Sequence, residues 1–312
     1  MDNRILKLNF KNTLSALSDL MMPRVCLVCG RPLTLREKHL CLPCSLDLPL
    51  TRFECLEHNP MADKYNARIG SGLYEPYQRA TALLHYWHDS GYANIPQALK
   101  YERNFEAGRY FGSMLGKRLR SSPLFADIDL VVPVPLHWTR RLRRGYNQAE
   151  ILARAIAREL SAPEGDRSGS SPSETRPRKV ALAPRLLRRV RRTRTQTRKT
   201  ISEKSLNVSG AFEVRRVRTL GGSSEGMCKN SPKRTYPRLF SGGYARFGGT
   251  EGQSNVDNQQ NKAKWFGRNI KHILIVDDVF TTGSTLTECH NALRKVFGPD
   301  IRISLATLSF AG

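Results

Sequence analysis

The chain has 312 residues, which allows one large domain or two small ones, and 39% of them are hydrophobic. That share is low for a globular chain, so part of the length is expected not to pack. The formal net charge of +24 favours polyanionic partners such as nucleic acid. No uncharged apolar run approaches the about 18 residues of a membrane span, and no secretory signal is recognisable at the N-terminus. We therefore expect a cytoplasmic protein without a membrane span.

Residues 1–60 predict an N-terminal unit made of a helix and a zinc ribbon. Residues 3–22 place apolar side chains at broadly helical spacing, which predicts a packing helix; an interfacial membrane helix is the alternative, disfavoured by its largely uncharged polar face. Cys26-x2-Cys29-x11-Cys41-x2-Cys44 has the spacing of two metal knuckles. Four thiolates close the tetrahedral shell of Zn²⁺ and leave no open position, so the site is structural. Four reduced core cysteines are the alternative, but they do not explain the spacing.

The elements that follow the ribbon are short. We expect a strand at Ile69–Tyr74, a helix at Tyr77–Trp87 and a second helix at Phe105–Leu119. Asn147, with Glu150 three residues on, resembles a capping box at the start of another helix. The inner face of that helix is expected to carry Ala149, Leu152, Ala153, Ile156 and Leu160.

The stretch from Asp129 to His137 predicts a buried strand that ends at a rigid loop. Leu130–Val132 is apolar without alternation, and Pro133 cannot donate to a sheet ladder. A basic segment comes next, with Arg140, Arg141, Arg143 and Arg144 before Gly145. Its guanidinium groups are suited to bidentate contacts with an anion such as pyrophosphate, and a solvated basic loop is the alternative.

The most informative stretch is Ile273–Thr285. Four apolar residues predict a strand buried on both faces of a parallel sheet, and this strand is expected to stop at Asp277 and Asp278. A run of small hydroxyl residues then leads into a helix, which predicts an anion cradle of free N–H groups at a helix N-terminus. The acids require hydroxyl groups or a cation, so a ribose with a 5′-phosphate satisfies both features. A buried strand followed by a capped helix is the alternative.

This stretch resembles the phosphoribosyl pyrophosphate (PRPP) signature of type I phosphoribosyltransferases. Together with the CxxC pairs, VPVPLH and RRGYNQAE, it is similar to the ComF family, competence-associated proteins with a zinc ribbon before a phosphoribosyltransferase-like domain. The resemblance implies that ribose and phosphate contact Asp277, Asp278, Val279, Thr281, Thr282, Gly283, Ser284 and Thr285. It implies that pyrophosphate contacts Val134, Pro135, Leu136, His137, Arg140 and Arg144. Lys100 lies in a Leu-Lys-Tyr element of that family and either faces a phosphate or is a surface lysine.

The implied fold is α/β, a type I phosphoribosyltransferase-like parallel sheet flanked by helices with a small N-terminal zinc ribbon. Residues 61–312 would form this second domain. Two segments depart from the family pattern, at about 161–178 and 217–269, and their Gly-rich or Ser-rich, charged composition predicts disordered insertions. Aromatic residues between cations in the second insertion are also compatible with stacking on single-stranded bases.

The expected function is PRPP binding with Mg²⁺, and a link to DNA uptake, through single-stranded DNA or the competence machinery. Turnover would be transfer of the phosphoribosyl group to an acceptor that the residues do not identify. Oxopurine-salvage enzymes carry an acid where this chain has Thr281, so that general base is absent. The alternative is a non-catalytic zinc protein that binds single-stranded nucleic acid and uses the PRPP fold as a scaffold or sensor.

Overall fold

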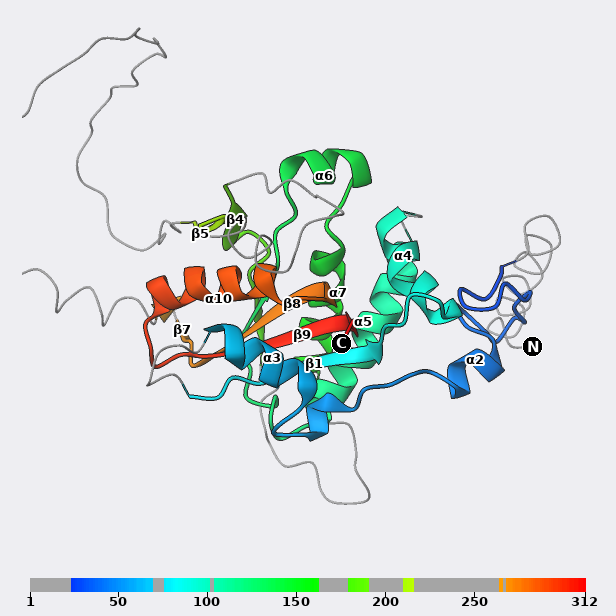
Figure 1. The fold of residues 1–312 in the computed structure, drawn as a ribbon, viewed down its shortest axis with the longest axis horizontal. Helices are drawn as coiled ribbons and strands as arrows, with labels where there is room; N and C mark the ends of the chain where they lie inside the picture. The colour runs from blue at the N-terminus through cyan, green and yellow to red at the C-terminus, as the bar shows by residue number, and fades with distance from the viewer. Residues whose placement is uncertain are drawn as a thin grey trace, which may run out of the picture.

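The computed structural model describes residues 24–69, 76–101, 104–162, 179–190, 210–215, 264–265 and 268–312. A five-stranded sheet lies at the centre, in the order β1-β9-β8-β2-β3, and every neighbouring pair is parallel (Figure 1). The strands are β1 (Ala80–His85), β2 (Leu130–Pro133), β3 (Ala181–Leu182), β8 (His272–Phe280) and β9 (Arg302–Phe310). A parallel sheet flanked by helices confirms the expected fold class.

Strand β8 is central because its side chains are apolar on both faces. Ile273 and Ile275 belong to one buried cluster, whereas Leu274 and Val276 belong to the other, as the two-residue period of a strand requires. The sequence predicts that this strand stops at the acids, but in the structure it does not. It continues to Phe280, because β9 is equally long and pairs Asp277 with Thr307 and Phe280 with Phe310.

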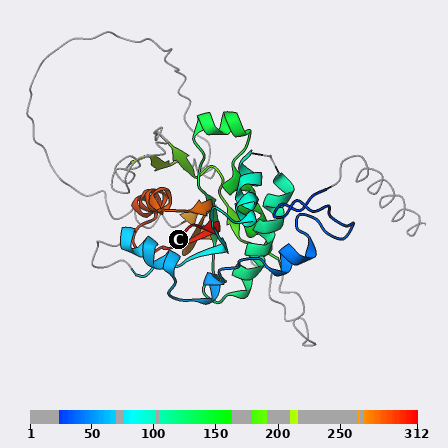
Figure 2. The same ribbon diagram turned by 45° about the vertical axis from the view of Figure 1, so that its right-hand side comes forward.

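Helices cover both faces of the sheet. Helices α3 (Pro60–Ile69) and α10 (Ser284–Phe297) pack on one face, and α5 (Phe105–Ser121) and α7 (Gln148–Leu160) pack on the other (Figure 2). Helices α5 and α7 approach closely because α5 carries Gly108, Gly112 and Gly116 at four-residue spacing. A Cβ atom on Gly112 would lie 2.8 Å from the Cβ atom of Ala155.

Two further local expectations were wrong. The helix expected at Tyr77–Trp87 is strand β1, whose first five residues are buried against the sheet; periodicity does not separate helix from strand in a short apolar run, and pairing with β9 decides it. Asn147 does occupy the N-cap of α7, but its side chain makes no capping bond and instead donates from Nδ2 to the carbonyl of Val134 at 2.9 Å. The helix at Phe105 and the inner face of α7 are confirmed.

Several expectations fall largely outside the described residues. The helix at 3–22 lies there, as do residues 70–74 of the strand expected at Ile69–Tyr74, while Ile69 itself ends α3. Most of both insertions lies there too, apart from Ser161 and Ala162 and the two-residue strands β6 (Lys264–Trp265) and β7 (Arg268–Asn269). None of the helices in the described part of the chain is both long and apolar enough to cross a bilayer.

The remaining described elements are short and surround the sheet. They are α2 (Leu42–Leu46), α4 (Asn94–Tyr101), α6 (Trp138–Arg144), the antiparallel hairpin of β4 (Leu187–Arg189) and β5 (Phe212–Val214), and two 3-10 turns, η1 (Phe53–Cys55) and η2 (Gly91–Ala93). Helix α6 stands between this hairpin and α4 in both views of the fold (Figures 1 and 2). Three segments distant in the chain therefore meet at one end of the molecule.

Candidate functional site

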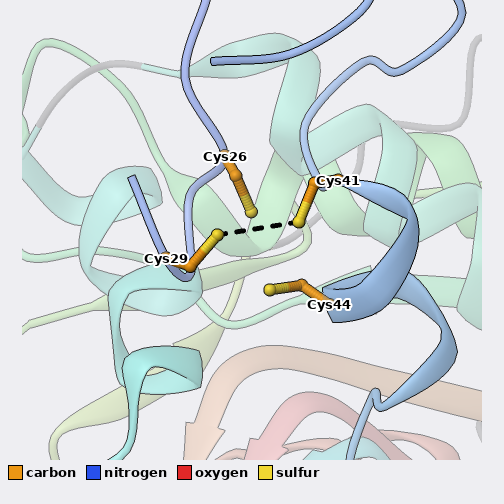
Figure 3. Close-up of side chains that lie close together, drawn as sticks. All are labelled: Cys26, Cys29, Cys41 and Cys44. Atoms are coloured by element: carbon orange, nitrogen blue, oxygen red, sulfur yellow. Dashed lines mark hydrogen bonds between the residues drawn. The ribbon is translucent and has the colours of Figure 1, made fainter. Parts of the chain in front are cut away.

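The four spaced cysteines come together in the ribbon. The metal-ligating atoms of Cys26, Cys29, Cys41 and Cys44 all lie within 4.8 Å of one another, and their sulfur atoms point to a common centre (Figure 3). The Sγ atoms of Cys29 and Cys41 are 3.6 Å apart. Tetrahedral Zn²⁺ with Zn–S bonds of about 2.3 Å places neighbouring sulfur atoms about 3.8 Å apart. The donor set and its spacing therefore fit a structural zinc ion.

The electrostatics of this cluster favour a bound cation. Burial opposes ionisation of Cys26, but hydrogen bonds from the backbone N–H groups of Cys29, Cys41 and Val28 lower its pKa to about 6. Burial and the three neighbouring thiols raise the pKa of Cys44. Four thiolates at this distance repel one another, and a divalent cation removes that repulsion. Cys55, outside the pattern, is an exposed free thiol.

The two acids lie in the C-terminal half of β8. Asp277 Oδ1 accepts a hydrogen bond from the Asp278 N–H at 2.8 Å, and Asp278 Oδ1 accepts one from the Val279 N–H at 2.8 Å. Part of Asp277 reaches solvent, yet withdrawal of its carboxyl group from water, reinforced by the charge of Asp278, raises the pKa of Asp277 well above its usual value. The proximity of the two carboxyl groups therefore opposes ionisation of Asp277.

The hydroxyl-rich loop joins the end of β8 to the start of α10. No hydrogen bond among the described residues engages the backbone N–H groups of residues 281–285. The Thr282 and Ser284 hydroxyl oxygens are 3.0 Å apart, and Arg68 Nη1 of α3 donates to Ser284 Oγ at 3.4 Å. Free amides, hydroxyl groups and a guanidinium at the N-terminus of a 14-residue helix make a cradle for an anion.

Gly283 is required for the shape of this loop. Its φ is +77°, a left-handed conformation, and it is the N-cap of α10. A Cβ atom at this position would lie 2.8 Å from Cζ of Phe280. The loop therefore folds tightly against the last residue of β8, which fixes the cradle beside the acids.

Cations from three other elements surround the acids. Lys100 Nζ, in the last turn of α4, is 3.5 Å from Asp278 Oδ2. Burial and the neighbouring guanidinium groups of Arg144 and Arg143 lower the pKa of Arg140, and Asp278 counteracts that shift. Arg189 of β4 has a pKa lowered by burial and by Arg140, with Asp277 acting in the opposite direction. The three cations are therefore within electrostatic range of the couple.

The expected pyrophosphate loop lies at the end of β2, beside β8. The Val134 N–H donates to the carbonyl of Val276 at 2.8 Å, which places Val134 beside β8 just before the acids, and Pro135, Leu136 and His137 follow it. His137 is buried and caps α6, because its Nδ1 accepts from the Thr139 N–H at 3.3 Å. The arginines that follow lie on α6, and this helix ends at Gly145 with φ of +81°.

Sequence reasoning missed three features of this region. Arg189 and Arg68 were not singled out, because no local motif marks them and only the fold brings them close. A cavity of about 750 Å³ between the ribbon and α5 was also missed. Its lining includes Arg24, Lys38, Arg109, Lys117, Tyr110 and one acid, Glu106. The helical spacing of Glu106, Arg109, Tyr110, Ser113, Met114 and Lys117 would have indicated that one face of α5 lines a common surface.

A cluster at the start of β8 resembles a catalytic triad, but its histidine and serine are buried. His272 Nδ1 is 2.7 Å from Asp127 Oδ1, and His272 Nε2 is 2.8 Å from Ser304 Oγ. Ser304 is only 3% exposed and His272 only 1%. A substrate could not reach the hydroxyl group, so this cluster serves to join β8, β9 and the segment before β2.

The fold and these sites define a helix-flanked parallel-sheet protein with a four-cysteine metal cluster and a strand-end pair of acids beside an anion cradle. Over 210 residues, 66% of its length, the chain is 23% identical to Competence protein F of Haemophilus influenzae (strain ATCC 51907 / DSM 11121 / KW20 / Rd). The match covers 63% of that relative, less than two thirds of its length. This similarity confirms the resemblance to the ComF family. No protein-family model matches the chain.

Proposed function

We propose that the protein binds PRPP, or a related ribose 5-phosphate, together with Mg²⁺. One observation carries this proposal: the acids of β8 lie directly before a loop with unengaged N–H groups at a helix N-terminus. The 5′-phosphate would bind the N–H and hydroxyl groups of residues 281–285. The ribose hydroxyl groups would bind Asp277 and Asp278. The carboxylate of Asp278 is held in place by a hydrogen bond from the Val279 N–H.

The pyrophosphate group would lie toward the end of β2. The segment from Val134 to His137 borders the acids, and Arg140 and Arg144 on α6 supply guanidinium groups there. Mg²⁺ prefers oxygen ligands and retains waters, so Asp277 and Asp278 would help to hold it, and it would neutralise part of the charge of the ligand. The surrounding cations match a ligand that carries two phosphate-bearing groups on one ribose.

If the bound PRPP reacts, the reaction would be displacement of pyrophosphate at C1′ by an acceptor. The bond from C1′ to the pyrophosphate oxygen would break, and the acceptor would form the new bond. The chain would contribute by holding ribose and pyrophosphate in fixed positions and by stabilising the charge that develops on the leaving group through Arg140 and Arg144. Thr281 offers no carboxylate to remove a proton from the acceptor.

Isothermal titration of Mg-PRPP into the wild type and Asp278→Asn tests the proposal. We expect the variant to bind at least about tenfold more weakly, because it loses a charged acceptor for the ribose and the metal. Asp300→Asn, an equal charge change on an exposed turn, is the matched control and should bind as the wild type does. No heat of binding with the wild type would overturn the proposal, and release of pyrophosphate with a panel of acceptors would identify turnover.

A second candidate function is binding of single-stranded nucleic acid during DNA uptake, as the name of the relative makes reasonable. The observation that favours it is the 750 Å³ cavity, lined by four cations and the ring of Tyr110. His39 lies 5.3 Å from that ring, centroid to centroid. A basic groove with aromatic rings is the arrangement that binds single strands through phosphates and base stacking.

The second candidate is tested by fluorescence anisotropy of a labelled single strand at several salt concentrations. Each phosphate contact contributes a slope of about −0.7 in log affinity against log salt. Arg109→Ala should lower the affinity and flatten the slope, whereas the control Lys295→Ala, an equal loss of charge at an exposed position of α10, should change neither. Affinity that does not vary with salt would exclude this function.

We extend the proposal to the setting of the protein. Residues 1–60 would form the zinc-ribbon unit and residues 61–312 the phosphoribosyltransferase-like domain, with the competence machinery as partner in the cytoplasm. Co-purification with tagged components of DNA uptake, in wild type and in a deletion of residues 1–60, would test the role of the ribbon in that partnership.

A further inference from the structure

Lys100 lies where a ligand of Asp278 would have to bind. Its Nζ is 3.5 Å from Asp278 Oδ2, and the two side chains are 25% and 17% exposed. The second oxygen of that carboxylate accepts from the Val279 N–H. The other oxygen, Oδ2, is therefore the one that a ribose hydroxyl or a metal ion would approach. This oxygen is also the one nearest to the lysine.

The backbone that carries Lys100 is fixed, whereas its side chain can move. Leu99 is fully buried, and the Tyr146 hydroxyl group donates to the Leu99 carbonyl. The lysine side chain extends from this fixed point on a flexible four-carbon stem with three rotatable donors. A change of partner for its ammonium group therefore requires no movement of α4.

The charges around the couple indicate when the ammonium group would change partner. Lys100 Nζ lies within ion-pair distance of Asp278 Oδ2, so the ammonium group balances the charge of that carboxylate. Arg140 of α6 is also within electrostatic range of Asp278. An anionic ligand between α4 and α6 would offer the ammonium group phosphate oxygens with more charge than the carboxylate it leaves.

We infer that Lys100 is an exchangeable counter-ion, which neutralises Asp278 while the site is empty and transfers to a phosphate oxygen when the sugar phosphate and its metal bind. This inference rests on the proposed function. Lys100 is a positioning residue: it blocks a divalent cation from Asp278 until the anionic ligand arrives, and then it holds that ligand. Removal of its charge should therefore change the affinities for metal alone and for Mg-PRPP in opposite directions.

The test compares two affinities in one set of variants. Binding of Mn²⁺ alone is followed by electron paramagnetic resonance, and binding of Mg-PRPP by calorimetry. In Lys100→Met we expect Mn²⁺ to bind about tenfold more tightly, because the ammonium group no longer neutralises Asp278. We expect Mg-PRPP to bind about tenfold more weakly, because the ammonium group no longer binds a phosphate oxygen. Lys100→Arg keeps the charge and should restore both affinities toward the wild type. Lys295→Met, the same charge change in the last turn of α10, should change neither.

The double variant Lys100→Met with Asp278→Asn locates the metal. The gain in Mn²⁺ affinity should disappear in this variant, because the carboxylate that Lys100 had neutralised is gone. Affinities that fall together in Lys100→Met would show a structural role and overturn the inference, as would two unchanged affinities. If the wild type binds Mg-PRPP and Lys100→Met binds it equally well, only this inference fails. If the wild type binds no Mg-PRPP, the proposed function and the exchange both fail.

Discussion

The substitution Gly283→Ala tests the geometry of the loop between β8 and α10. The left-handed φ of +77° costs a residue with a Cβ atom roughly 1–2 kcal/mol. The new Cβ atom would lie 2.8 Å from Phe280 Cζ and 3.1 Å from Cε2, well inside the about 3.5–4.0 Å of an ordinary carbon contact. Phe280 is fully buried and its ring lies 5.8 Å from that of Phe310, so it cannot move aside. Overpacking of this kind costs about 1–3 kcal/mol.

The total loss of stability is therefore about 2–5 kcal/mol. Equilibrium unfolding in urea, followed by circular dichroism, measures it from the midpoint at unchanged slope. Gly210→Ala is the matched control, because φ there is +67° and nothing lies within 4 Å of the added Cβ atom; only the left-handed cost of about 1–2 kcal/mol should appear. Equal losses in the two variants would refute the close contact between the loop and Phe280.

Three further predictions concern the acids, the ribbon and the helix pair. Asp277→Asn should raise the stability above about pH 4. The carboxyl group of Asp277 has a raised pKa in the folded state, so it lowers the free energy of unfolding as pH rises past the unfolded pKa of about 3.9. An unchanged pH dependence of the urea midpoint would contradict this. Extraction of zinc by a chelator should lower the thermal midpoint, with recovery on addition of Zn²⁺ and none with Mg²⁺, and an unaffected midpoint would exclude a structural metal. Gly112→Ala should destabilise the protein although alanine favours a helix by about 1 kcal/mol, because the added atom overlaps Ala155 at 2.8 Å; a stabilised variant would show that α5 and α7 do not touch there.

Features that depend on adjacent residues could be predicted from the sequence. The cysteine spacing indicated one metal cluster, and the sulfur atoms do meet. The apolar run before Asp277 indicated the buried strand of a parallel sheet, and β8 is that strand. The acids, the glycine and the hydroxyl groups of the cradle follow one another in the chain, so their proximity is fixed by local geometry alone.

The tertiary structure decided which other groups join them. Three cations come from segments far apart in the chain, namely Lys100, Arg140 and Arg189. They lie near the acids because the C-terminal ends of parallel strands, and the segments that follow those ends, lie at the same edge of the sheet. The apolar segment at Ala80–His85 is a strand because β9 offers it a partner, which no local pattern records. Short-range spacing thus specified the acids and their loop, whereas the cations that complete the site depend on contacts that form only when the whole sheet is assembled.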